Sequence, residues 1–187
     1  MNTVASIVGV DNGRSLSSCL EAELATVGQV KLEMASHGSI HFACHASQEV
    51  NNPLRSGFYL HDGRLELADI MQQRIPHCDL AYLSACQTST GDEKLSEEAV
   101  HIAGGMLAVG YRSVVATMWS IKDSAGPVVA ARFYKYLMEQ RGSTRQPGLN
   151  STRAAYALHY ALQGIRKPSG DTEEDLLTWV PYVHFGY

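Results

Sequence analysis

Short β-rich runs alternate with longer runs of helical periodicity along this chain of 187 residues. Such alternation is typical of a parallel sheet whose strands are joined by crossover helices. Four runs are predicted to be strands of that sheet: residues 6–10, 38–44, 79–85 and 113–118. The last run is apolar on both faces, as expected of a central buried strand. The sequence therefore predicts the α/β class.

Apolar residues at helical spacing predict four helices between and after these strands. Ser96 can cap the second helix, and Asp123 or Ser124 can cap the third. Glycines at 110 and 164 are expected to end the second and the fourth. The apolar faces consist of Leu16, Leu20, Leu24 and Val27, then Ala99, Ile102, Met106 and Val109, then Val129, Phe133, Tyr136 and Leu137, and finally Ala154, Leu158, Ala161 and Leu162. Helices on both faces of the sheet make a three-layered architecture.

Two further patterns modify the parallel sheet. Residues 57–60 and 64–67 flank a loop containing Asp62-Gly63, which predicts an antiparallel hairpin inserted after the second strand. Residues 179–185 are predicted to form an edge strand, because Pro181 cannot donate a hydrogen bond to a ladder. No linker or internal repeat interrupts the chain, and its length suits one hydrophobic core. We therefore expect a single domain over residues 1–187.

The composition excludes several classes of protein. With 45% hydrophobic and 18% charged residues, the chain is too apolar for intrinsic disorder. The balance of 15 Lys+Arg against 19 Asp+Glu gives a net charge of −4, and no basic cluster interleaved with aromatics is present, so a nucleic-acid partner is not expected. No apolar stretch approaches the roughly 20 residues that cross a bilayer. The sequence predicts a soluble, cytoplasmic protein that does not bind membranes.

The four cysteines are Cys19, Cys44, Cys78 and Cys86. They lie in apolar segments, where thiols behave as small hydrophobic groups, and we expect them to be reduced. No Cys-x-x-Cys pair is present, and the adjacent pairs at 44–45 and 77–78 fit no common zinc module. We therefore expect neither a metal nor an organic cofactor.

The most informative pair is His45 and Cys86. Each follows the carboxyl end of a predicted parallel strand, which is where open α/β sheets place their active sites. If those strands are neighbours, their ends lie about 4.8 Å apart, so an imidazole and a thiol projecting from them can meet. A nearby imidazolium favours the nucleophilic thiolate. From the residues alone, the alternative of a buried small Cys86 and a strand-end His45 satisfied by hydrogen bonds remains equally open.

Several strings occur together and in a specific order: HFACHA at 41–46, LSACQT at 83–88, GDE at 91–93, VVATMWSIKD at 114–123 and FY at 133–134. Together they resemble the CHAT domain, a family grouped with caspases, separases and gingipains. The resemblance implies a caspase-like three-layer α/β/α sandwich with a mostly parallel central sheet. It also implies that His45 is the general base and Cys86 the nucleophile of a thiol peptidase acting on a protein substrate, with the backbone N–H groups of Ala46 and Cys86 binding the oxyanion.

The chain departs from the family pattern in three respects. Where the family commonly has glycine, this chain has Ala46, which keeps the N–H but narrows the permitted backbone angles. The chain is also shorter than the family near residues 24–25, so we expect an incomplete sheet edge. CHAT domains usually accompany tetratricopeptide or similar repeats, and this chain contains no such repeat. The resemblance therefore implies a repeat-containing regulatory region or partner. The alternative function is a catalytically inactive interaction or regulatory module of the same fold.

Four further residues are candidates for the site. Asp123 matches the region where this clan builds its substrate pocket, although a helix N-cap is the favoured interpretation, and both roles can hold together. A cleft-facing Asp123 would prefer a basic side chain at the cleavage position. Asp92 and Glu93 are either solvated or part of an acidic rim of the pocket. His41 shares a strand face with His45, so it can orient His45 or fill the sheet interior, and the interior is favoured.

Overall fold

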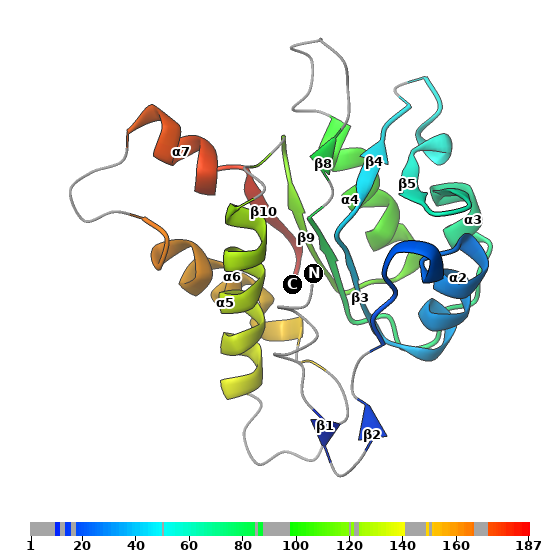
Figure 1. Ribbon diagram of the computed structural model, residues 1–187, viewed down its shortest axis with the longest axis horizontal. Helices are drawn as coiled ribbons and strands as arrows, with labels where there is room; N and C mark the ends of the chain where they lie inside the picture. The colour runs from blue at the N-terminus through cyan, green and yellow to red at the C-terminus, as the bar shows by residue number, and fades with distance from the viewer. Residues whose placement is uncertain are drawn as a thin grey trace.

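The computed structural model describes residues 10–11, 14–15, 18–49, 51–84, 86–87, 98–119, 121, 124–140, 149, 151–166 and 172–187, and of these it describes the backbone alone for residues 10–11, 14–15, 86–87, 98–101 and 174. Strands form the middle layer, and helices lie on both sides of them (Figure 1). Together with the parallel pairing at the centre of the sheet, this arrangement confirms the predicted α/β sandwich.

The first half of the middle layer is a sheet of four strands in the order β10-β9-β7-β3. Its strands are β3 (Ser39–Phe42), β7 (Leu80–Leu83), β9 (Ser113–Thr117) and β10 (Tyr182–Gly186). The first three are parallel, whereas β10 runs antiparallel to β9. The prediction of a central strand at 113–118 is confirmed, because β9 lies between two strands and its first four residues are buried.

The second half is a sheet in the order β6-β5-β4-β8. It contains β4 (His45–Ser47), β5 (Gly57–Leu60), β6 (Gly63–Glu66) and β8 (Cys86–Gln87). The chain segment of β3 continues into β4, and that of β7 continues into β8. Ser39 pairs with Leu80 and His45 with Cys86, so the register offset is 41 residues in both halves. The pairing of β3 with β7 therefore continues, after a short interruption, as the pairing of β4 with β8, and these segments connect the two sheets.

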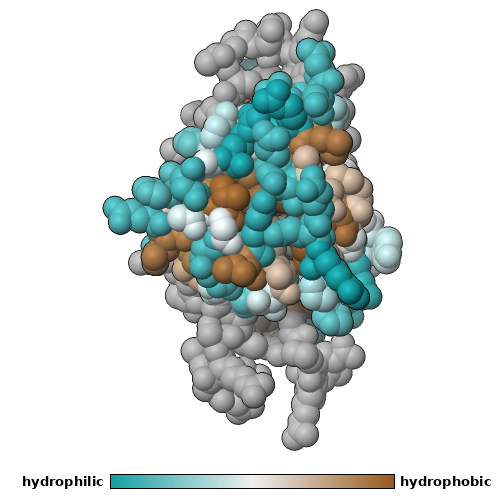
Figure 2. All heavy atoms as spheres, turned by 90° about the vertical axis from the view of Figure 1, so that its right-hand side faces the viewer, coloured by the Kyte–Doolittle hydropathy of each residue, from teal (hydrophilic) through white to brown (hydrophobic). Residues whose placement is uncertain are grey.

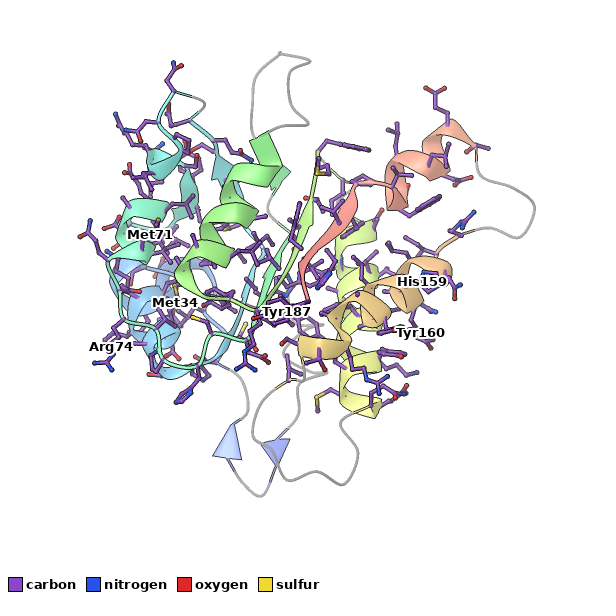
Figure 3. The ribbon with its side chains drawn as sticks, turned by 180° about the vertical axis from the view of Figure 1, so that it is seen from behind. Met34, Met71, Arg74, His159, Tyr160 and Tyr187 are labelled. Atoms are coloured by element: carbon purple, nitrogen blue, oxygen red, sulfur yellow. The ribbon has the colours of Figure 1, made fainter. Side chains whose placement is uncertain are left out.

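Helices cover the two faces with separate hydrophobic cores. The helices α2 (Val27–Ser36), α3 (Leu67–Met71) and α4 (Glu98–Val109) pack on one face, and α5 (Ala125–Glu139) and α6 (Ala154–Gln163) pack on the other. Figure 3 shows the two sides: Met34 and Met71 lie at one side of the sheet, and His159 and Tyr160 lie at the other. Seen from the side of α2 and α3, the surface is mainly hydrophilic with separate hydrophobic patches (Figure 2).

Most predicted helix faces are confirmed. Ile102 and Met106 are buried in α4, and Gly110 follows that helix at a φ of +117°, where glycine is favoured. In α5 and α6 most residues of the third and fourth predicted faces are buried, and Tyr136 and Leu162 are half-buried. Ser124, however, has helical backbone angles and makes no capping bond with its side chain, so its expected cap is not formed. Ser96 and Asp123 lie outside the described residues.

The predicted first helix is wrong in its position. The helix begins only at Val27, while Leu24 lies in a short 3-10 turn (η1, Ala22–Leu24) and is 67% exposed. The helix start is set by hydrogen bonds: Thr26 Oγ1 accepts from the backbone N–H of Gln29, and Asp62 Oδ1 accepts from that of Val27 at 2.7 Å. Leu16 lies outside the described residues.

The chain termini also differ from the prediction. Trp179, predicted to begin the edge strand, is instead the last residue of a helix, α7 (Glu173–Trp179), which begins with a capping box made by Thr172 and Asp175. The edge strand β10 starts only at Tyr182. Of the predicted first strand, Val10 alone is described. It belongs to β1 (Val10–Asp11), which pairs antiparallel with β2 (Arg14–Ser15) in a separate two-stranded sheet.

The inserted hairpin is confirmed, with small shifts at its ends. Strands β5 and β6 pair antiparallel, with His61 and Asp62 between them and Gly63 already in β6. Leu67 begins α3 instead of continuing the strand, since Glu66 and Asp69 form a capping box. Two further 3-10 turns, η2 (Pro53–Arg55) and η3 (Ser151–Arg153), precede β5 and α6. None of the described helices has the length and apolar character that crossing a membrane requires.

Candidate active site

The parallel pairing of β4 with β8 places the two candidate catalytic residues side by side in the backbone. His45 is the register partner of Cys86, and Ala46 is the partner of Gln87. The condition set out from the sequence, that the strands leading to His45 and Cys86 are neighbours, is therefore met in the backbone. Both residues follow the break in the central segments, at the carboxyl end of β3 and of β7, where open α/β sheets build their sites.

The two faces of β4 differ in burial. Ala46 points into the core below α2, α3 and α4 and is 4% exposed, whereas His45, one residue earlier, is exposed. Strand residues alternate between faces, so burying Ala46 turns His45 toward the opposite, open side. An exposed imidazole can exchange protons with a substrate or with water, as a general base must. Ala46 is flanked by β5 on one side and β8 on the other, so the sheet holds its backbone beside the pair.

Comparison with known families decides what kind of domain this is. The family model described as the CHAT domain matches residues 3–187. The chain belongs to the CHAT domain family. No curated protein matches the chain. Membership covers nearly the whole sequence, so the strands that carry His45 and Cys86 both lie within the family match.

His41 of this CHAT domain lies on β3, the outer strand of its sheet, and is half-buried against β7 and α5, in keeping with the interior position favoured from the sequence. Its Nε2 shares a hydrogen bond of 3.0 Å with Ser84 Oγ. Its ring centroid lies 4.7 Å from that of Tyr82 and 5.7 Å from that of Tyr134. Burial lowers the pKa of His41 to about 4, so its imidazole is neutral at neutral pH. The hydrogen bond to Ser84 fixes this ring within the core.

The cysteines with described side chains have little tendency to ionise. Burial raises the pKa of the Cys44 thiol to about 12, and Cys44 packs against the core as predicted. Burial also raises the pKa of Cys78, whose Sγ contacts the Ile75 carbonyl oxygen at 3.5 Å. Cys19, predicted to lie in an apolar segment, is instead exposed, and partial burial together with a hydrogen bond to Glu21 raises its pKa. None of these three environments activates a thiol.

The remaining predicted site residues lie outside the described part of the chain. These are Asp92, Glu93 and Asp123, which were expected to line or border the substrate pocket. Within the described ranges, no group of three or more His, Cys, Asp or Glu side chains is arranged to hold a metal ion.

Sequence reasoning missed a polar network next to His45. Arg64 on β6 donates to Ser47 Oγ on β4 at 3.2 Å and to Glu66 Oε1 at 2.6 Å. The hydrogen bond to Glu66 is the main reason why the pKa of Arg64 is raised further. The only signal in the sequence is the alternation of Arg64 and Glu66 with Leu65, which shows that the hairpin has a polar face but not what that face contacts.

Proposed function

We propose that this CHAT domain is a cysteine endopeptidase that cleaves a protein substrate with His45 and Cys86. The observation that carries the proposal is the parallel register in which these two residues are partners across β4 and β8. Paired strands lie about 4.8 Å apart, so the imidazole and the thiol start from backbone positions within reach of a hydrogen bond. The exposure of His45 supports the role, because a general base must be accessible to the reacting groups.

The proposed reaction has two steps. The Cys86 thiolate attacks the scissile carbonyl carbon, a carbon–sulfur bond forms, and the peptide carbon–nitrogen bond breaks while His45 gives its proton to the leaving amine. Water then attacks the thioester; His45 takes one proton from it, and Cys86 leaves as thiolate. The acid product is released, and the imidazolium–thiolate pair is restored. Backbone N–H groups at Cys86 and Ala46 hold the oxyanion in both steps.

The proposal extends to substrate choice and context. Carboxylates at Asp123, Asp92 and Glu93 would favour a basic side chain at the cleavage position, since a partly desolvated carboxylate is stabilised by a charged partner. We also propose that the domain works in the cytoplasm, where thiols stay reduced, under the control of a repeat-containing region or partner.

One observation favours the alternative of a catalytically inactive interaction module. Ala46 stands where the family commonly has glycine, and it is buried and paired on both sides. Its backbone is therefore less free than that of glycine to turn its N–H toward an oxyanion.

Thiol labelling separates the two functions. The folded protein is treated with peptidyl acyloxymethyl ketones that carry Arg, Asp or Leu at the cleavage position, and the modified cysteine is located by mass spectrometry. We expect Cys86 to be labelled first, ahead of exposed Cys19, and most rapidly by the Arg probe. Cys19 is an internal control for accessibility alone. Labelling of Cys86 should be lost in His45→Ala. Absent labelling of Cys86 in a folded sample, or labelling equal to that of Cys19, would support the inactive module.

A further inference from the structure

The hairpin sheet has an open polar face that begins at His45. On β4, His45 and Ser47 alternate with buried Ala46. On β6, Arg64 lies beside Leu65, which is fully buried in the core. Because strand residues alternate between faces, Arg64, Ser47 and His45 belong to the same side of the sheet, opposite α2, α3 and α4.

Arg64 reaches across the middle strand of this sheet. Its Nη1 donates to Ser47 Oγ at 3.2 Å, although β5 lies between the two strands. Gly57 on β5 pairs with Ser47 on one side and with Glu66 on the other. A Cβ at Gly57 would overlap the backbone oxygen of Leu65, so the position requires glycine. The row of Ser47, Gly57 and Glu66 therefore lacks a side chain on β5, which leaves room for the guanidinium of Arg64 to enter it from the neighbouring row, where Arg64 is the register partner of Tyr59.

The guanidinium and its neighbours fasten the chain that follows His45. Arg64 Nη2 donates to Glu66 Oε1 at 2.6 Å, and its Nη1 lies 3.9 Å from Glu49 Oε1. The Arg64 side chain is 21% exposed. The backbone N–H of Glu49 donates to the hydroxyl of Ser56 at 3.0 Å, and Ser56 is fully buried. The segment is thus held at positions 47 and 49 on one side of His45.

We propose that Arg64 is a positioning residue that fixes the end of β4 and thereby aims His45 at Cys86. The inference rests on the function proposed above. An isolated surface ion pair contributes little, but this half-buried guanidinium joins β6, β4 and the loop after β4 in one network. Its planar fork donates to two partners in a fixed geometry. Displacing a catalytic group by about 1 Å can lower a rate about 100-fold. The hydrogen bond from Arg64 to Ser47, two residues after His45, is therefore expected to affect the chemical step.

The test compares two variants by their reaction with the Arg acyloxymethyl ketone. In Arg64→Met, a side chain of similar length loses every donor. We expect its maximal inactivation rate to fall about 10-fold or more, with the concentration for half-maximal rate changed less than about threefold. Arg64→Lys should recover part of the rate, because an ammonium donates to Ser47 or Glu66 without the planar fork.

Lys31→Met is the matched control. It removes an ion pair of similar exposure, in which Lys31 Nζ lies 2.8 Å from Asp69 Oδ1 and joins α2 to α3. Its inactivation rate should equal that of the wild type. An equal fall in both Met variants would overturn the proposal, since the effect would then be general destabilisation.

Amide hydrogen exchange supplies a measurement that needs no activity. In a Cys86→Ala background, Arg64→Met should speed exchange at residues 47–49 about 10-fold and leave β9 unchanged. Unchanged exchange at these residues would overturn the role of Arg64. A wild-type protein that shows no Cys86 reactivity would instead overturn the proposed function, so the two failures are distinguishable.

Discussion

One pair of parallel segments, residues 39–47 and 80–87, contains two different chemical environments. Its two halves keep the same register, yet the first half is enclosed by helices on both faces. There, β7 is buried throughout and the ring of His41 packs between the sheet and α5. In the second half, the described residues of β4, β5 and β6 contribute to the core under α2, α3 and α4, while His45 is exposed on the other side.

The difference shows that helix coverage decides the chemistry of each position. His41 and His45 are the same residue type, four positions apart on one strand face. Burial lowers the pKa of His41 to about 4 and raises the pKa of the nearby Cys44 thiol to about 12, so both are neutral at pH 7. The imidazole of the enclosed half and the thiol in the break that follows it therefore pack as neutral groups, whereas the open half can present such groups to a substrate.

Replacing each of the two histidines with alanine gives the largest expected effects, and the two variants should differ in what they lose. His45→Ala should lower the maximal rate of Cys86 inactivation about 1,000-fold or more, because the proposed base is lost, and change the free energy of unfolding by less than about 0.5 kcal/mol. His41→Ala should instead cost about 2 kcal/mol of stability by emptying a buried site and orphaning Ser84. Urea titration and probe kinetics measure both. Similar losses of rate in the two folded variants would break the distinction between the halves.

Much of this arrangement could be predicted from the sequence. Alternating strands and helices imply a parallel sheet, and the carboxyl ends of parallel strands meet at one edge, so His45 and Cys86 were expected to be neighbours. The two-residue period of a strand placed His41 on the same face as His45, and an interior position was favoured for it. These inferences need only the period of a strand and the direction of the chain.

Long-range polar contacts could not be predicted in the same way. The start of α2 depends on Asp62, which is 35 residues away, so apolar spacing placed the helix too early. The path of Arg64 to Ser47 depends on a glycine in the intervening strand and on the register of three strands. Trp179 looked like a strand residue, but the local capping box at Thr172 starts a helix. Each error comes from a polar contact that hydrophobic periodicity does not encode.

The pH dependence of the free energy of unfolding tests whether the enclosed half keeps His41 neutral. The folded pKa of His41 is lowered from 6.5 to about 4, so between these values the unfolded chain binds the extra proton and stability falls as pH falls. Between pH 7 and pH 5 the loss should be about 2 kcal/mol. His41→Phe should lack this component, measured as the difference between the urea stabilities of the two proteins at each pH.

Taking the difference between the stabilities of the wild type and His41→Phe also removes the contributions of other titratable groups. Burial also lowers the pKa of His184, and burial raises that of Asp79, which acts in the opposite direction at lower pH. Both residues are unchanged in His41→Phe, so their contributions cancel. Parallel pH profiles for the two proteins would show that His41 binds its proton as readily in the folded protein as in the unfolded chain, and the enclosed half would then not disfavour the charged imidazole.

The smallest expected effect concerns the tip of the hairpin. A substitution there should change the stability of the open half without changing the inactivation rate of Cys86. Asp62→Ala removes the acceptor for the Val27 N–H and should lower the free energy of unfolding by about 1 kcal/mol, with faster amide exchange at the start of α2. Asp62→Asn keeps an acceptor oxygen and should retain most of that stability. The rate of Cys86 inactivation should stay within about twofold in both, because the bond lies at the opposite end of β5 from its pairing with β4. A larger loss of rate in Asp62→Ala would mean that the tip, and not Arg64 alone, holds β4, and that the open half depends on the α2 layer for its geometry.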